Sequence, residues 1–291
     1  MQETTQQHEG KLVKRRGLLA KAVRDIRIVV GAIIILLFVI MAIFAPFLAP
    51  HDPVSIDVML RRQPPSTEFW LGKDELGRDI LSRIIFGARV SLVVGLSATF
   101  FGGAFGTMIG LITGYYGGKI DVVLGRFIDV LLAFPGILLA LVIVTVLSPG
   151  TTSVIIAITI FAIPSFARIV RGSTLGVKRL EYVDAIRAVG ASDLRIMFRH
   201  ILPNIWSPIM VQATLYVGTA IVISATLAFL GVGTQPPVPD WGGMLNGGRE
   251  FLAIAPHIVM IPGMTIFLLV LGINMFGEGL KELLEPKSNK R

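Results

Sequence analysis

The sequence predicts an all-α polytopic membrane protein with six transmembrane helices. Hydrophobic residues make up 53% of the 291 residues and charged residues only 16%, whereas soluble domains carry roughly 25% charged residues. The mean hydropathy is +0.75, and the apolar residues gather in charge-free blocks long enough for spanning helices of about 20 residues. Together these observations exclude a soluble globular protein and a disordered chain.

Five charge-free blocks contain most of the predicted spans. The block 130–167 is too long for one helix and includes the turn-forming sequence Ser148-Pro149-Gly150, so we expect two spans joined by a short hairpin. Residues 235–239 read Gln-Pro-Pro-Val-Pro and cannot be helical, so the block that contains them ends in a loop. The six predicted spans are 28–49, 90–114, 124–147, 152–171, 205–231 and 254–277.

The distribution of Lys and Arg predicts that both termini are cytoplasmic. With the N-terminus inside, 20 of the 27 basic residues fall in inner segments. The expected organisation is a cytoplasmic tail at 1–27, the first span at 28–49, an external loop at 50–89, a five-helix core at 90–278 and a cytoplasmic tail at 279–291. The membrane accounts for the net charge of +8, so anionic lipid is an expected partner and nucleic acid is not.

The external loop is expected to contain a short amphipathic helix that lies along the outer surface before the second span. Charged residues occupy the rest of this segment, and its apolar residues recur at helical spacing. The expected role of this helix is a structural lid or an interface. Its apolar face consists of Ile80, Leu81, Ile84, Ile85 and Ala88.

Small residues mark one face of the second span. Four glycines follow Ala98 at intervals of four residues and form a smooth ridge on which another helix can approach closely. We interpret this ridge as a helix-packing seam that is either static or slides during gating. Its glycines are Gly102, Gly106, Gly110 and Gly114.

Few ionisable residues lie at membrane depth. Arg126 and Asp129 are three residues apart near the inner end of the third span, which predicts an i,i+3 ion pair. No series of carboxylates or histidines runs along any span, and this argues against a proton-coupled carrier. Pro135 in the third span and Pro164 in the fourth predict kinks.

The chain lacks the motifs of membrane-embedded enzymes. It has no cysteine, which excludes disulfides, thiol catalysis and cysteine-ligated metals. It also has no His-Glu-x-x-His, no Gly-x-Ser-x-Gly and no nucleotide-binding Gly-x-x-x-x-Gly-Lys-Ser/Thr. We therefore expect no catalytic residues, metal site or cofactor in this chain. A permease subunit, a stand-alone carrier and a channel stay open at this point.

The longest inner connection, at 172–204, is expected to form a helical hairpin. Its first helix is predicted at 180–189 and ends at Gly190, a natural residue to follow a helix. Ser192 or Asp193 can cap the second helix, which is predicted to end at Pro203. Such a basic, exposed hairpin is shaped either to dock on a protein or to lie on anionic lipid.

This hairpin resembles the coupling loop of ABC-importer permeases, whose pattern is Glu-Ala-Ala, three residues, Gly, and then Ile-x-Leu-Pro. The chain has Asp184 for Glu, retains Ala185 and Gly190, and has Ile186 for the second Ala and His200 for Ile. Residues 71–83, 229–242 and 279–286 are similar to motifs of the C-type subunit of dipeptide and oligopeptide importers. The similarity covers the chain from about residue 20 and is weakly specific for substrate, since relatives carry nickel, glutathione or oligosaccharides.

The resemblance implies a type I importer permease bundle in a bacterial or archaeal plasma membrane, with cytoplasmic coupling helices. It further implies a paired B-type permease, two ATPase subunits that bind ATP and Mg, and an external binding protein that delivers di- or oligopeptides. By analogy, the helix at 180–189 docks in a groove of one ATPase, with Asp184 and Arg187 making polar contacts and Val183 and Ile186 inserting as apolar side chains. The coupling residues implied by the resemblance are Tyr182, Val183, Asp184, Ala185, Ile186, Arg187 and Gly190. No motif marks substrate-binding residues.

Overall fold

The computed structural model describes residues 22–284, and within them it is helical with no β-strand. Most of the two predicted tails therefore lies outside the described residues. Five helices are long and apolar enough to span a membrane, and a sixth span is possible if a bent pair of helices is counted as one. The predicted all-α membrane fold is confirmed. The helices of the potential spans are α2 (Ile26–Ile43), α4 (Ile80–Tyr116), the bent pair α5 (Gly118–Ala133) and α6 (Gly136–Leu147), α7 (Thr151–Lys178), α10 (Trp206–Phe229) and α12 (His257–Leu284).

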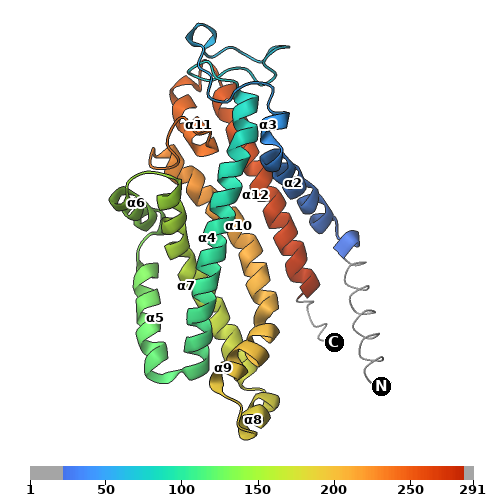
Figure 1. Cartoon of the computed structure of the whole chain (residues 1–291), viewed down its shortest axis with the longest axis vertical. Coiled ribbons are helices and arrows are strands. Elements are labelled where there is room, and N and C mark those ends of the chain that lie inside the picture. Colours follow the sequence, from blue (N-terminus) through green and yellow to red (C-terminus); the bar gives the residue numbers. More distant parts are fainter. Residues whose placement is uncertain (1–21, 285–291) are drawn as a thin grey trace.

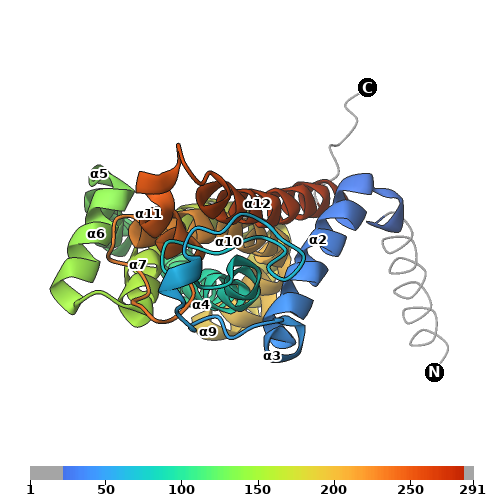
Figure 2. The ribbon, with the colours of Figure 1, turned by 90° about the horizontal axis from the view of Figure 1, so that it is seen from above.

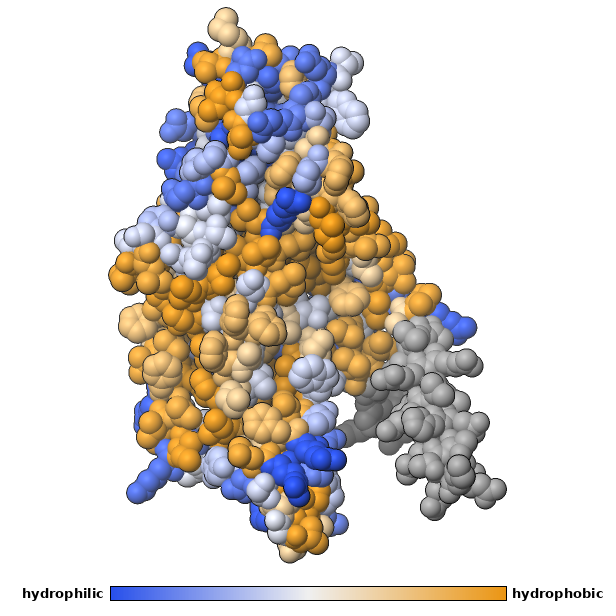
Figure 3. Space-filling model, in the orientation of Figure 1, coloured by the Kyte–Doolittle hydropathy of each residue, from blue (hydrophilic) through white to orange (hydrophobic). Residues whose placement is uncertain are grey.

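Helix α4 lies in the middle of the bundle (Figures 1 and 2). It packs against α7 on one side and against α2 and α10 on the others, while α12 lies beside α2 and α10. The short helix α8 (Glu181–Ala188) projects from one end, here termed the α8 end, and α11 (Trp241–Gly248) lies at the opposite α11 end. Figure 3 shows, on the face in view, a mainly apolar middle between two more polar ends, as expected for a protein that crosses a bilayer.

Helix α4 is one continuous helix of 37 residues, so the prediction of a separate surface helix in the loop 50–89 is wrong. Asp79 caps its first turn by accepting the Ser82 N–H at 2.8 Å. Most apolar residues at its start are buried, in a cluster with side chains of α2, α11 and α12, and the Trp241 indole N–H donates to the Ile84 carbonyl at 3.0 Å. The amphipathic pattern was correct, but the apolar side faces protein rather than lipid.

The predicted third span at 124–147 is not one helix. It is divided into α5 and α6, which meet at an angle of 91°. The break follows from Pro135, because a residue that precedes proline is driven out of the helical region. Phe134 accordingly adopts an extended conformation, with φ −82° and ψ 137°. The kink expected at this proline is a sharp corner.

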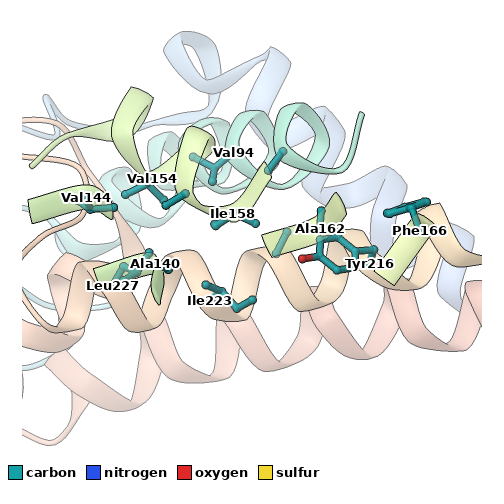
Figure 4. Close-up of a cluster of buried hydrophobic side chains, with 13 residues drawn as sticks. Val94, Ala140, Val144, Val154, Ile158, Ala162, Phe166, Tyr216, Ile223 and Leu227 are labelled. Carbon is teal, nitrogen blue, oxygen red and sulfur yellow. The ribbon is translucent and has the colours of Figure 1, made fainter. Parts of the chain in front are cut away.

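Close contact between α4 and α7 dominates the packing of the bundle. The four ridge glycines of α4 face α7, and each lies so near it that a β-carbon would collide with main-chain or side-chain atoms. At Gly106, for example, a β-carbon would lie 2.6 Å from Phe166 Cβ and 2.7 Å from the Ile163 carbonyl oxygen. Glycine is therefore required by the distance between the two backbones. Figure 4 shows the adjoining core, where Val94 lies beside Ile158, and Tyr216 lies beside Phe166 farther along the same cluster.

We predict that Gly106→Ala lowers the stability of the protein by about 1–3 kcal/mol, because the added methyl group must push α4 and α7 apart. Thermal unfolding of the purified protein in detergent measures the loss. Gly172→Ala on α7 is the matched control, since a β-carbon there meets nothing within 4 Å. Equal stability of the two variants would show that the ridge is not closely packed.

Candidate functional site

The predicted hairpin forms the tip of the α8 end (Figure 1). Helix α8 coincides with the helix expected at 180–189. The chain then turns and continues from Asp193 to Phe229 as α9 (Asp193–Arg195), a π-helical turn at 196–201, a 3₁₀ turn at 202–205 and α10. The second helix therefore does not end at Pro203. This proline lies in the first turn of the 3₁₀ segment, where its missing N–H is tolerated.

Gly190 reverses the chain after α8. Its φ is +83°, and a β-carbon there would meet nothing within 4 Å. The Gly190 N–H donates to the Arg187 carbonyl at 3.0 Å, and the Ala191 N–H donates to the Ile186 carbonyl at 3.3 Å. These bonds satisfy carbonyls at the end of α8, which is the usual task of a glycine in this conformation. Backbone conformation, and not crowding, therefore selects glycine at this position.

Helix α8 is anchored to the bundle by one fully buried apolar side chain and by the half-buried Ile186. Val183 is fully buried, and it packs in a cluster with Leu111, Tyr115, Val170 and Ile196. The expectation that Val183 inserts into a partner is therefore corrected, because this side chain lies on the face of α8 that turns toward the bundle. The cluster joins α8 to the ends of both α4 and α7.

Hydrogen bonds fix the same hairpin. The Tyr115 hydroxyl at the end of α4 donates to Asp193 Oδ1 at 2.6 Å, so Asp193 binds α4 rather than capping its own helix. Tyr182 accepts a hydrogen bond from Asn204 Nδ2 at 3.1 Å, and the same amide donates to the His200 carbonyl at 2.6 Å. These contacts connect α8 to the segment that leads into α10. The hairpin is thus in contact with α4, with α7 and with the segment before α10.

The outward face of α8 carries both charges and exposed apolar side chains. Arg187 Nη1 lies 3.1 Å from Asp184 Oδ1, and both side chains are largely exposed. Ala185 is exposed beside them, whereas Ile186 is half-buried and packs against the apolar cluster around Val183. We define the α8 tip as Asp184, Ala185, Arg187 and three apolar residues that the sequence interpretation missed, namely Leu180, Val189 and Leu194. Val189 is 84% exposed and Leu194 63% exposed. The sequence does contain a signal for these residues, because apolar residues lie on both sides of Gly190 within an otherwise polar loop.

A buried ionic cluster stiffens the α11 end. Arg78 Nε lies 2.6 Å from Asp74 Oδ2, Arg78 Nη2 lies 2.7 Å from Glu75 Oε1, and Arg83 Nε lies 3.4 Å from Asp74 Oδ2. Burial raises the pKa of the Glu75 carboxyl above its usual range. This cluster contains four of the six charged residues of the motif at 71–83, so these residues have a structural task in the loop before α4.

Helix α11 was not predicted from the sequence. Asp240 begins it by accepting the Gly243 N–H at 3.1 Å, and Trp241 anchors it in the core beside α4. The capping aspartate followed by a large apolar residue was the local signal. Because four of its eight residues are glycines, helix propensity gave the opposite indication.

Charged residues also meet between α5 and α7, in a pocket of about 360 Å³. Asp129 pairs with Arg168 of α7 at 3.5 Å and not with Arg126, so the predicted i,i+3 pair is corrected. Arg171 binds Asp121 through two hydrogen bonds of 2.6 Å. Both acidic side chains of α5 thus pair with arginines of α7. Spacing within α5 could not predict these pairs, because the partners lie on another helix.

Two family models match the chain. The first describes the inner membrane component of binding-protein-dependent transport systems and matches residues 106–290. The second describes the N-terminal transmembrane domain of oligopeptide transport permease C and matches residues 24–65. The first match alone covers more than half of the chain and includes the α8 hairpin.

Curated relatives are similar over most of their length. The glutathione transport system permease protein GsiD of Shigella flexneri serotype 5b (strain 8401) is 49% identical over 258 residues, which cover 88% of this chain and 85% of the relative. GsiD of Escherichia coli O6:K15:H31 (strain 536 / UPEC) is 48% identical over the same shares.

Solved structures show the same fold. Two crystal forms of the MetNI methionine ABC transporter in inward facing conformations match with TM-scores of 0.57 and 0.59 at 20% identity. They cover 69% and 70% of this chain, and 96% and 97% of the matched chain. Together with the family models and the relatives, the helical bundle and its projecting hairpin show that the chain belongs to the inner membrane components of binding-protein-dependent transport systems, as a non-catalytic permease subunit of an ABC importer.

Proposed function

We propose that this permease imports short peptides, namely di- or oligopeptides including glutathione. The N-terminal family model is that of an oligopeptide permease, and the relatives named above are glutathione permeases. Glutathione is itself a tripeptide, so the two findings favour one chemical class of cargo over nickel or oligosaccharides.

We infer that the chain works with a paired B-type permease, two ATPase subunits that bind ATP and Mg, and a binding protein that delivers the cargo. The chain has no nucleotide-binding motif, so the energy for import must come from partners. The observation that carries this proposal is the α8 tip, where Val189 and Leu194 are exposed at the extremity of the bundle. Apolar side chains that project in this way favour a protein contact.

The mechanism proposed for the α8 tip is mechanical. An ATPase binds α8 through Asp184, Arg187 and the exposed apolar residues, and closure of the ATPase dimer displaces the helix. Because Val183 and the Tyr115–Asp193 hydrogen bond fix α8 to the ends of three long helices, the bundle turns as a body. The pathway is then open alternately to each side of the membrane.

We predict that Gly190→Ala uncouples transport from ATP hydrolysis. Alanine at a φ of +83° costs about 1–2 kcal/mol and misplaces α8. Uptake of alanyl-alanine per ATP hydrolysed, in proteoliposomes that contain the complete importer, measures the effect. Gly176→Ala near the end of α7 is the control, because it is equally uncrowded and has no positive φ. Unchanged coupling in Gly190→Ala would contradict the role of this turn.

Charge reversal tests the docking face. Asp184→Lys should weaken ATPase binding by at least about tenfold, because a like-charge contact at an interface costs several kcal/mol. Co-purification of the ATPase subunits with the permease provides the measurement. Glu278→Lys is the control, since this exposed carboxylate lies on α12 away from α8. ATPase recovery with Asp184→Lys that equals the wild-type value would remove α8 from the interface.

We further propose that both termini and the α8 tip are cytoplasmic. The chain has no native cysteine, so single cysteines report on topology without background from this subunit. In intact cells, an impermeant thiol reagent should label Glu68→Cys in the loop before α4 and should leave Ser192→Cys in the hairpin unlabelled. Both positions are exposed. The reverse pattern of labelling would invert the proposed orientation.

A further inference from the structure

The pocket between α5 and α7 contains more charge than helix packing requires. Its walls carry three arginines and two aspartates, Arg126, Arg168, Arg171, Asp121 and Asp129. One pair has a clear structural task, because Arg171 and Asp121 join α7 to α5 with two short hydrogen bonds. The remaining three side chains are left with little to bind.

Their contacts are weak. Arg168 reaches Asp129 through one nitrogen at 3.5 Å, and the two side chains are 67% and 64% exposed. Arg126 is exposed and forms no ion pair within residues 22–284. One carboxylate and two guanidinium groups are therefore available to a ligand. The complete cluster carries one more positive than negative charge.

These exposed charges lie well inside their helices and not at the helix ends. Arg168 is ten residues from the end of α7 and Asp129 is eleven residues from the start of α5, which places each about 15 Å from the helix end. Charges at such depth face water or another polar surface, because hydrocarbon solvates them poorly. We therefore infer that this side of α5 and α7 borders water or a polar surface rather than lipid.

The floor of the pocket is open. Gly125 lies between the charged residues of α5, and a β-carbon there would meet nothing within 4 Å. The pocket volume of about 360 Å³ falls in the range of small-molecule sites, roughly 300–1,000 Å³. Space thus occurs together with one arginine that has no ion pair in the described part of the chain, Arg126, and one long, exposed pair, Arg168–Asp129.

We propose that this pocket binds the charged ends of a peptide during its passage through the inner half of the pathway. Arg126 and Arg168 bind the terminal carboxylate, and Asp129 binds the terminal ammonium. The cargo replaces the weak Arg168–Asp129 pair with two pairs of its own, so entry leaves both ends of the peptide paired while the cluster keeps its net charge of one positive. The excess positive charge favours a cargo with a free carboxylate. This proposal deepens the function proposed above and rests on it.

Protection of a cysteine tests the pocket without the binding protein. Gly125→Cys places a single thiol in the pocket, and the complete importer is prepared with cysteine-free partner subunits. We expect alanyl-alanine to slow modification of this thiol by a charged methanethiosulfonate. Alanyl-alanine amide, which lacks the carboxylate, should require an approximately tenfold higher concentration. In the Gly125→Cys background, adding Arg126→Gln should remove the difference in protecting concentration between alanyl-alanine and its amide. Adding Lys119→Gln, outside the pocket, should preserve that difference.

Gly172→Cys on α7 provides the control thiol, which neither alanyl-alanine nor its amide should protect.

The possible outcomes distinguish a failure of the pocket proposal from a failure of the proposed peptide import. If the wild-type importer takes up alanyl-alanine while neither probe protects Gly125→Cys, or both protect it equally, the pocket proposal is overturned alone. If the importer takes up neither alanyl-alanine nor glutathione, the peptide function is overturned and the pocket proposal with it. Protection by phosphatidylglycerol that peptide does not change would assign the arginines to lipid. Loss of the partner permease from Arg126→Gln would assign them to the subunit interface. Either result overturns a cargo site.

Discussion

Direct contact between the backbones of α4 and α7 is the constraint on which the rest of the bundle depends. The ridge glycines bring the two helices so close that even one methyl group at Gly106 would collide with α7. In lipid, where apolar side chains gain little from meeting one another, such close packing is a main source of helix association. The core of Val94, Ile158 and Phe166 beside the ridge then has a rigid frame to pack against.

The α8 end takes its geometry from the same two helices. Val183 packs against residues from the ends of α4 and α7, and Tyr115 of α4 binds Asp193 beyond α8. A hairpin held by only a short loop would absorb a displacement by bending. Here the hydrogen bond and the buried valine make the hairpin an extension of the bundle, which is the property that a coupling element needs.

The sequence predicted the parts of the fold that local chemistry determines. The long apolar blocks specified the spans, and Gly190 correctly marked the end of α8 with its positive φ. The failures have tertiary causes. Helix α11 is stabilised by Trp241 in the core rather than by the helix propensity of its residues. Val183 is buried because its face of α8 is turned toward the bundle. The partner of Asp129 lies on another helix, where spacing along one chain segment carries no information. The residues of the hairpin alone left docking on a protein and binding to anionic lipid both open, and only the resemblance favoured docking.

The unbroken length of α4 has a consequence for how such a chain can vary. At one end its side chains lie under Trp241 of α11, in the middle its glycines face α7, and at the other end Tyr115 binds Asp193. Successive residues of an α-helix are rotated by about 100° around its axis. Inserting or deleting a single residue between Ile84 and Tyr115 would therefore turn the side chains at one end of α4 away from their partners. We therefore expect insertions to be tolerated in the loops but not in α4. The number of residues in α4 is fixed because the side chains at its two ends must point in set directions relative to each other.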